Sequence, residues 1–383
     1  MWPPIKFCSA KCNLRHGSGF ASCFGDLRGT TMLRFALVGC GRIARRHAEL
    51  LGGGHIEGAR LAAVCDVVQQ RAQALGQRYS VPHFTDMHEM MQSGFIDAVS
   101  VLTESGRHAA HVIELAQYGK PIVVEKPMAL TLDDADRMIS ACDRQNVRLF
   151  VVKQNRFNVP VVRLRQALDA GRFGKLALGT VRVRWCRTQD YYDQDTWRGT
   201  WALDGGVLTN QASHHVDLLE WMMGEVESVQ AMSTRALANI EAEDTAVVTL
   251  KFANGALGIV EATTAARPRD LEGSISILGE RGTVVIGGFA VNKMEVWSFV
   301  DPAPDDADAL HRFSVNPPTV YGFGHHAYYE HVVDCLKRSA PHLVDGIQGR
   351  KSLELISAIY ESIETRRQVD LRFKPAYCKL GRG

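Results

Sequence analysis

The sequence predicts an α/β fold, with a parallel-sheet domain at the N-terminus and a C-terminal α+β domain built on an open antiparallel sheet. Three observations predict it. A short apolar run is followed by Gly-x-Gly-x-x-Ala within residues 33–44. Apolar strands and helical segments then alternate to residue 152, which indicates a parallel sheet covered on both faces. Beyond residue 158 short strands follow one another, in part through hairpin turns, which favours antiparallel pairing.

The glycine motif has the order strand, tight turn and helix. Residues 33–38 form the expected strand, and residues 45–51 can open a helix. Gly39 permits the tight turn, Gly41 leaves room for a pyrophosphate, and the small Ala44 allows close packing of helix on strand. Free N–H groups at the helix start also favour a phosphate there. The motif therefore predicts a dinucleotide-binding (Rossmann) domain.

A second strand supports this reading. Residues 60–66 are largely apolar and end in Asp66, about twenty residues after the motif, where a carboxylate can hold the ribose hydroxyls of a dinucleotide. Val67 and Val68 follow, in place of an arginine that could meet a 2′-phosphate. We therefore expect NAD and not NADP.

The rest of the first domain continues the alternation. Ligands bind at the carboxyl ends of such parallel strands, which here are residues 39–43, 66, 103–108, 125–127 and 153–158. Thr131 is placed to cap a helix. The expected elements are an extended piece over 81–84, strands over 96–102, 121–124 and 147–152, and helices over 86–93, 107–118 and 132–145.

The second domain is expected to contain an aromatic loop over 191–201 and several strands. Asn254-Gly255 between two apolar runs is a strong hairpin signal. One sheet face should carry helices, and the other is expected to pair with a second subunit. The expected elements are strands over 175–185, 246–252, 256–263, 274–278, 283–286 and 293–299, and helices over 161–170, 208–223, 325–338 and 349–366.

Composition excludes several classes. The chain has 383 residues, enough for two domains, and a net charge of +2, which argues against nucleic acid or an anionic membrane as the main partner. No apolar run approaches the roughly twenty residues of a membrane span. Nine cysteines, mostly in apolar segments, suit a reduced, cytoplasmic enzyme. We divide the chain into a leader over 1–31 that is disordered or precedes the true start at Met32, domains over 32–152 and 153–373, and a tail over 374–383.

The leader contains Cys8, Cys12 and His16, but no second ligand pair of familiar spacing follows, so we expect no metal.

Two further motifs carry chemistry. Glu125-Lys126-Pro127 ends a strand, and its Lys–Pro bond is a candidate for the cis form. Gly205-Gly206 precedes a segment in which Asn210 and His214 share one face if it is helical, because they stand four residues apart.

Together these motifs resemble the Gfo/Idh/MocA oxidoreductases, over about residues 33–373. The usual family pattern has Asp four residues before the histidine, whereas this chain has Asn210. Segments 102–108, 152–158, 197–201 and 210–214 further resemble the bacterial UDP-N-acetyl-2-amino-2-deoxyglucuronate (UDP-GlcNAcA) dehydrogenases, in which Asn is normal at this position.

The resemblance implies oxidation of the sugar C3 hydroxyl with NAD, in the synthesis of the diacetamido-mannuronic acid of surface polysaccharides such as lipopolysaccharide O-antigen. It also suggests a homotetramer. Whether NADH leaves or is reoxidised in place by 2-oxoglutarate stays open.

The site residues follow from the motifs and the resemblance. His214 is expected to act as general base, Lys126 to stabilise charge on the substrate oxygen, and Asn210 to orient the hydroxyl or the imidazole. His325 is a weaker candidate for the cleft. The expected cofactor residues are Gly39, Gly41, Arg42, Ile43, Asp66, Thr103, Glu104, His108, Glu125, Lys126 and Gln154, and the expected substrate residues are Lys153, Arg156, Asn158, Tyr191, Arg198, Asn210 and His214.

Three alternatives remain. A dehydrogenase of another sugar or an inositol would act on uncharged polyols. A glycoside hydrolase of this fold would use NAD transiently and release sugar without net NADH. A NAD-binding sensor would be catalytically silent, which the presence of both Lys126 and His214 disfavours.

Overall fold

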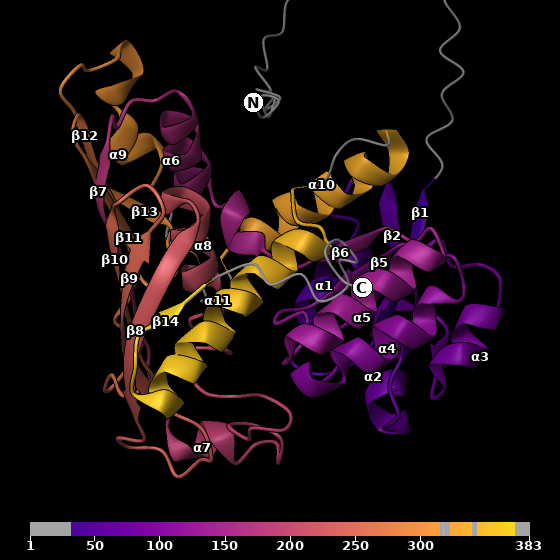
Figure 1. The fold of residues 1–383 in the computed structure, drawn as a ribbon. Coiled ribbons are helices and arrows are strands. Elements are labelled where there is room, and N and C mark those ends of the chain that lie inside the picture. The colour runs from indigo at the N-terminus through magenta and orange to yellow at the C-terminus, as the bar shows by residue number, and fades with distance from the viewer. Residues whose placement is uncertain (1–31, 315–316, 318–321, 339–342, 372–383) are drawn as a thin grey trace, which may run out of the picture.

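The computed structural model describes residues 32–314, 317, 322–338 and 343–371. Two sheets stand side by side with helices between and around them (Figure 1). The predicted leader with Cys8, Cys12 and His16, and the predicted tail over 374–383, lie outside the described residues. Within the described part of the chain, no helix combines the length and the apolar character that crossing a membrane requires.

The first sheet has six strands in the order β3-β2-β1-β4-β5-β6, and all of its pairs are parallel. This order places β1 and β4 next to each other at the point where the chain reverses its direction across the sheet, and ligands bind at such a point. The strands are β1 (Leu33–Val38), β2 (Ala59–Cys65), β3 (His83–Phe84), β4 (Ala98–Val101), β5 (Ile122–Val124) and β6 (Leu149–Val151).

Helices cover both faces of this sheet, as the alternation predicts. Thr131 caps α5, because its hydroxyl accepts the N–H of Asp134 at 3.1 Å. Asp86 caps α3 in the same way through the N–H of His88 at 2.6 Å. Helix α2 was not predicted from the sequence. The helices are α1 (Ala44–Gly52), α2 (Gln69–Tyr79), α3 (Met87–Gln92), α4 (His108–Ala116) and α5 (Leu132–Arg144), with 3-10 turns η1 (Ser105–Arg107) and η2 (Gln154–Phe157).

The second sheet has eight strands in the order β13-β12-β11-β7-β10-β9-β8-β14. It was expected to be antiparallel, but it is mixed, because β7 and β10 run parallel in register from Leu257 opposite Leu178. The chain reaches β10 from β7 only after α8, β8 and β9, so no hairpin sets their direction. The strands are β7 (Leu176–Arg184), β8 (Val226–Thr234), β9 (Thr245–Phe252), β10 (Leu257–Thr263), β11 (Glu272–Gly279), β12 (Gly282–Gly287), β13 (Lys293–Phe299) and β14 (Val369–Asp370).

The hairpin predicted at Asn254-Gly255 is confirmed. β9 and β10 pair antiparallel on either side of it, and Gly255 has a φ of +86°. Strand β8, which the sequence analysis did not identify, pairs with β9 and places Met232 opposite Val247.

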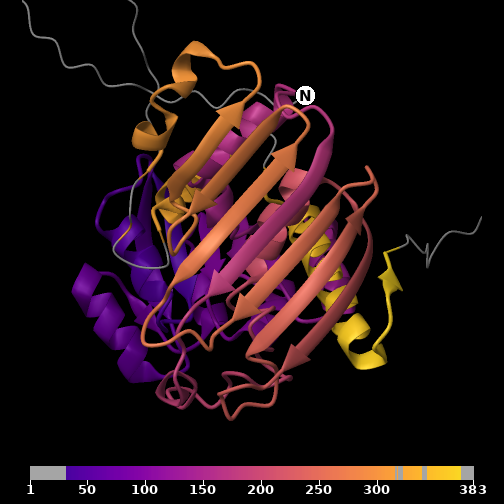
Figure 2. The ribbon, with the colours of Figure 1, turned by 90° about the vertical axis from the view of Figure 1, so that its left-hand side faces the viewer.

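One face of the second sheet packs on helices. Side chains of α8 and α11 share a buried cluster with the inward residues of the strands, and Figure 2 shows these helices behind the sheet. The helices that follow the first domain are α6 (Val159–Asp169), α7 (Gln189–Tyr192), α8 (Ser213–Met223), α9 (Ala309–Arg312), α10 (Gly324–Arg338) and α11 (Gly346–Thr365), with the 3-10 turn η3 (Pro304–Asp306).

Helix α10 packs on the first sheet although it follows the second sheet in the sequence. Tyr328, Tyr329 and Val332 are fully buried in one cluster with Phe35 of β1 and Leu51 of α1. Figure 1 shows α10 crossing above the first domain. The core of the first domain is therefore completed from the C-terminal end of the chain.

The helix expected over 208–223 is shorter than predicted. Regular helix begins at Ser213, and residues 207–211 form turns. The carbonyl oxygen of Val207 accepts the N–H groups of both Gln211 and Ala212, at 3.1 and 2.8 Å, which interrupts the regular pattern. Asn210 and His214 therefore do not lie on one face of a continuous helix.

Candidate active site

A cleft of about 1490 Å³ lies between the two domains at the carboxyl ends of the parallel strands. Ten of the eleven residues predicted to bind the cofactor come from the first domain, and all eleven line this cleft. The three predicted catalytic residues, Lys126, Asn210 and His214, line it as well. Residues far apart in the sequence thus meet in one place.

The glycine turn fits a dinucleotide. Gly39 has a φ of +97°, and a Cβ there would lie 2.7 Å from the carbonyl oxygen of Leu102, so the turn requires glycine. A Cβ on Gly41 would have no heavy atom within 4 Å, so this position opens into the cleft. Helix α1 starts with no side-chain cap at Ile43. The glycine turn therefore offers both open space and the uncapped backbone N–H groups of α1, and a bound pyrophosphate needs both.

Asp66 lies at the end of β2 and is nearly buried. One carboxylate oxygen accepts the N–H of Cys40 at 2.7 Å, and the other accepts the N–H of Val68 at 2.8 Å. Each carboxylate oxygen can accept a further hydrogen bond, so the group remains able to hold ribose hydroxyls. A negative charge at this position disfavours a 2′-phosphate.

His108 joins two loops at the floor of the cleft. Its ring nitrogens lie 2.7 Å from the carbonyl oxygen of Pro127 and 3.0 Å from that of Thr103. Burial lowers the pKa of His108. The loop after β4 and the loop after β5 are thereby fixed to each other. Thr103 and Glu104 lie on the first of these loops and line the cleft.

Lys126 precedes Pro127 through a cis peptide bond, as the sequence suggested. Its Nζ donates to the carbonyl oxygen of Asn210 at 2.6 Å and lies 3.4 Å from the side-chain oxygen of the same residue. Burial lowers the pKa of Lys126, and the negative charges of Glu125 and Asp204 oppose this change. The ammonium group is therefore held at the domain boundary by the segment before α8.

Glu125 lies between two histidines beneath Lys126. One of its carboxylate oxygens is 3.0 Å from Nε2 of His47 and 3.5 Å from Nε2 of His325, and the other accepts the N–H of Lys126 at 2.9 Å. Burial opposes ionisation, but hydrogen bonds from His325 and His47 keep the pKa of Glu125 well below its usual range. His325 lines the cleft, as its sequence position suggested.

The same three side chains bring potential metal ligands within 4.8 Å of one another, and their mutual hydrogen bonds account for the arrangement. The expectation of no metal stays a prediction.

His214 lies in the first turn of α8 and is 7% exposed. The amide N–H of Gln154 reaches its Nε2 at 2.8 Å, so this ring nitrogen carries a lone pair. Burial, with the nearby charges of Lys126 and Lys153, holds the pKa of His214 well below its usual value. A neutral imidazole with a lone pair can accept a proton.

Three expected substrate residues do not reach the cleft. Lys153 and Arg156 are buried, and both pair with Asp217 of α8, at 3.1 and 2.7 Å. Asn158 donates to the carbonyl oxygen of Ala290 at 3.2 Å. Internal partners occupy polar groups of all three residues beneath the site, and the expectation that they bind substrate stays a prediction.

The other expected substrate residues line the cleft. Arg198 donates to the hydroxyl of Tyr191 at 3.0 Å and pairs with Asp195 at 3.0 Å. Arg187, which was not predicted from the sequence, also lines the cleft and pairs with Asp270 at 2.8 Å. Asp204 was not predicted either, and its only sequence signal is its place before Gly205-Gly206.

Two family models match the chain, one in its N-terminal part and one in its C-terminal part. Residues 33–153 match the family model described as oxidoreductase family, NAD-binding Rossmann fold. Residues 165–371 match that of the oxidoreductase family, C-terminal alpha/beta domain.

Among solved structures, the chain is similar to the WlbA dehydrogenase from Bordetella pertussis in complex with NADH and UDP-GlcNAcA. The identity is 43% and the TM-score 0.84, over 90% of this chain and 99% of that one. The Chromobacterium violaceum WlbA dehydrogenase, in a complex with the same two molecules, is 42% identical with a TM-score of 0.84, over 90% of this chain and 97% of that one. Among curated proteins, myo-inositol 2-dehydrogenase from Thermotoga maritima is 28% identical over 88% of this chain and 98% of its own length.

Proposed function

Because this chain belongs to the Gfo/Idh/MocA oxidoreductase family, we propose that it oxidises the C3 hydroxyl of UDP-GlcNAcA to the 3-keto sugar. The predicted fold class, family resemblance, enzyme class and NAD cofactor are confirmed. The observation that carries the substrate proposal is the likeness, at 43% and 42% identity, to two dehydrogenases solved with UDP-GlcNAcA.

The cofactor residues fit NAD. We assign the pyrophosphate to the open side of Gly41 and the uncapped start of α1, and the adenosine ribose to Asp66. When bound, NAD accepts the hydride that the oxidation releases. The remaining residues that we assign to the cofactor are Gly39, Arg42, Ile43, Thr103, Glu104, His108, Glu125, Lys126 and Gln154.

The chain supplies the proton chemistry. His214 accepts the hydroxyl proton at Nε2: burial keeps the ring neutral, and the substrate hydroxyl takes the place of the Gln154 amide N–H that engages the lone pair of this nitrogen at 2.8 Å. Lys126 donates a hydrogen bond to the same substrate oxygen and stabilises the negative charge that develops there. Asn210 holds the ammonium group in place through its backbone and side-chain oxygens.

The substrate end of the cleft is cationic and aromatic. We assign the carboxylate and diphosphate of the substrate to Arg198 and Arg187, since a guanidinium can bind either group in a bidentate manner. The ring of Tyr191 lies beneath both, with the guanidinium carbons 4.8 and 5.3 Å from its centroid.

We also propose a homotetramer built through the outer face of the second sheet. Figure 2 shows no helix in front of the central strands of this face among the described residues. Met232, Val247 and Leu257 on neighbouring strands are 74%, 51% and 56% exposed. A second copy of this face would remove these side chains from water.

The test is to mix the full chain with NAD and UDP-GlcNAcA and to follow NADH absorbance with and without 2-oxoglutarate. NADH in the first arm supports the proposed reaction with release of the reduced cofactor. Formation of 2-hydroxyglutarate in the second arm supports the same reaction with reoxidation in place. If both arms are silent while NAD binds, the proposed substrate is wrong.

The second candidate is a dehydrogenase of an uncharged sugar or inositol, which the similarity to myo-inositol 2-dehydrogenase favours. A parallel arm with myo-inositol in place of the nucleotide sugar tests it. A third arm with a glycoside substrate, read by sugar release without net NADH, tests the hydrolase alternative. NADH formed faster from inositol than from UDP-GlcNAcA would replace our proposal by the second candidate.

A further inference from the structure

A buried carboxylate lies behind two of the predicted catalytic residues, Lys126 and Asn210. Asp204 is 1% exposed and lies six residues before Asn210, in the loop that leads to α8. Asn210 occupies the position at which the family usually has an aspartate. The negative charge that this chain lacks at position 210 is therefore present close by, on a different residue.

The hydrogen bonds of Asn210 link this carboxylate to Lys126. Its amide nitrogen donates to one oxygen of Asp204 at 2.5 Å, and its amide oxygen faces Nζ of Lys126 at 3.4 Å. A carboxylate only accepts and an ammonium only donates, so only one orientation of the amide suits both neighbours. The other oxygen of Asp204 accepts the N–H of Gly199 at 2.8 Å, which anchors it to the loop.

We propose that Asp204 is a positioning residue for Lys126, which fixes the orientation of the Asn210 amide and supplies the negative charge that keeps the ammonium group protonated. This inference rests on the proposed role of Lys126. Asp204 does not line the cleft, so it acts through Asn210 and not on the substrate.

Few negative charges act on Lys126, so the charge of Asp204 strongly affects its protonation. Glu125 and Asp204 favour its ammonium form, whereas Arg198 and Arg187 from the loops after β7 disfavour it, and burial lowers its pKa further. His214 from α8 also faces this group. Loss of one of only two negative partners leaves two arginines opposed by Glu125 alone.

The variant Asp204→Asn removes the charge and keeps the shape. We expect the pH at which Lys126 is half-reactive toward acetic anhydride to fall by roughly one pH unit, the typical effect of one nearby opposite charge. Competitive labelling of the full chain, read on the Lys126 peptide by mass spectrometry, measures this pH without any turnover. In the NADH assay, kcat should fall roughly tenfold at pH values above the pKa of Lys126 in both proteins, where the protonated fraction falls tenfold for one pKa unit, with KM little changed.

A double variant tests the charge directly. Asp204→Asn combined with Asn210→Asp returns one carboxylate to the neighbourhood of Lys126, and we expect the labelling pH to return toward the wild-type value. If the single variant does not fold, as judged by circular dichroism, the double variant and Asp204→Glu carry the test. Their labelling pH must then stay near that of wild type.

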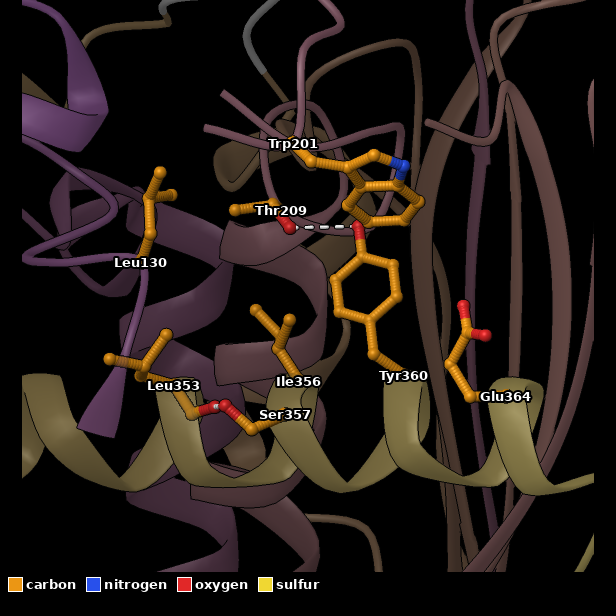
Figure 3. Close-up of a pocket in the computed structure, with 9 residues that line it drawn as sticks. Leu130, Trp201, Thr209, Leu353, Ile356, Ser357, Tyr360 and Glu364 are labelled. Carbon is orange, nitrogen blue, oxygen red and sulfur yellow. Dashed lines mark hydrogen bonds between the residues drawn. The ribbon is translucent and has the colours of Figure 1, made fainter. Parts of the chain in front are cut away.

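Glu243 offers a matched control on the opposite side of the same loop. It accepts the N–H of Leu208 at 2.9 Å and the hydroxyl of Tyr360 at 3.0 Å. Figure 3 shows Tyr360 of α11 directed at Thr209, in a pocket of about 360 Å³ behind the loop, and the two hydroxyls lie 2.8 Å apart. Glu243→Gln weakens the support of the loop but removes no charge that acts on Lys126.

We expect Glu243→Gln to leave the labelling pH of Lys126 unchanged. The inference is overturned if Asp204→Asn leaves that pH unchanged, or if Glu243→Gln shifts it equally, because the effect would then be one of loop structure. If the enzyme does not oxidise UDP-GlcNAcA, the proposed function fails, whereas the labelling experiment still decides the role of Asp204.

Discussion

The side-chain amide nitrogen of Gln154 lies 2.8 Å from Nε2 of His214. The contact joins the segment after β6 of the first sheet to the first turn of α8. The amide N–H donates to the lone pair of this ring nitrogen and thereby fixes the orientation of the ring. In this arrangement a side chain that directly follows the cofactor domain orients the proposed base on α8.

The first prediction concerns the pH dependence of the proposed base. Burial and the charges of Lys126 and Lys153 hold the pKa of His214 low. The ring therefore stays neutral at pH values at which an ordinary histidine becomes protonated. We expect kcat/KM to remain level from pH 8 down past about 6.5, the ordinary pKa of histidine. A pH–rate profile with UDP-GlcNAcA measures this, and an acid limb at or above pH 6.5 would contradict it.

Replacement of the base gives a companion result. We expect His214→Asn to lower kcat by about 10²–10⁴-fold, the usual contribution of a general base. NADH binding, read by fluorescence, serves as the control and should be retained. Near wild-type turnover in this variant would exclude His214 as the base.

The second prediction is that Lys126→Met lowers kcat by about 10²–10³-fold, as expected for loss of a donor to a developing oxyanion. Methionine keeps much of the side-chain length but cannot donate a hydrogen bond. NAD should still bind within a few-fold of the wild-type affinity, since the glycine turn and Asp66 are untouched. Calorimetric titration with NADH separates the two effects, and unchanged turnover would contradict the role.

The third prediction concerns stability. Asp217 is the common partner of Lys153 and Arg156, and all three are buried. Asp217→Asn leaves two buried cations without their counter-ion, and we expect a loss of about 3–5 kcal/mol in the free energy of unfolding. Urea titration measures it. As a control, Glu227→Gln breaks the exposed pair with Lys251 and should cost at most about 1 kcal/mol.

The same residue sets a pH dependence. Burial opposes ionisation, but Arg156 and Lys153 lower the pKa of Asp217 to about 2, below the value of about 3.9 in an unfolded chain. Its stabilising contribution is therefore complete above pH 4 and is lost as the pH falls toward 2. The difference in stability between wild type and Asp217→Asn should narrow over this range. A constant difference would show that the charge of Asp217 does not matter.

The fourth prediction contrasts two glycines of one turn. Gly39→Ala places a Cβ 2.7 Å from a carbonyl oxygen at a φ of +97°, so it should destabilise the protein by at least about 1–2 kcal/mol. The Cβ of Gly41→Val would meet no heavy atom within 4 Å, so we expect the melting temperature of this variant to be unchanged and its NADH affinity to fall at least tenfold. Calorimetry provides both readings. Wild-type NADH affinity in Gly41→Val would rule out the proposed phosphate position.

The fifth prediction tests the assembly. Val247→Glu places a charge on the outer face of the second sheet, and we expect sedimentation to show a smaller species than wild type. Leu310→Glu in α9 is the control, since Leu310 is also exposed, at 48%, but belongs to a helix and not to a strand of the sheet. Assembly that survives Val247→Glu would place the interface elsewhere.

Local signals allowed much of this fold to be predicted. Thr131 and Asn254-Gly255 act within a few residues of themselves, so the cap of α5 and the β9–β10 hairpin follow from sequence. The parallel pairing of β7 with β10 depends on which distant strand fits between β11 and β10. Sequence spacing does not report such a choice.

The site residues likewise divide into those indicated by local motifs and those that depend on contacts distant in the sequence. Motifs that end strands identified the cleft residues, because parallel strands bring their carboxyl ends to one edge. The pairing of Lys153 and Arg156 with Asp217 was not predicted, since Asp217 comes from a helix about sixty residues later. Asp204 was missed for a similar reason, because its importance depends on contacts with Asn210 and Gly199.

Helix α10 also determines how this protein can be divided into fragments that fold. Its tyrosines complete the core beneath β1, so a fragment ending at residue 152 exposes Phe35 and Leu51 to water. A chimera that exchanges the cofactor domain between relatives must therefore transplant two separate stretches, residues 32–152 and the α10 segment. The boundary between the two domains of the folded protein therefore does not correspond to a single position in the sequence.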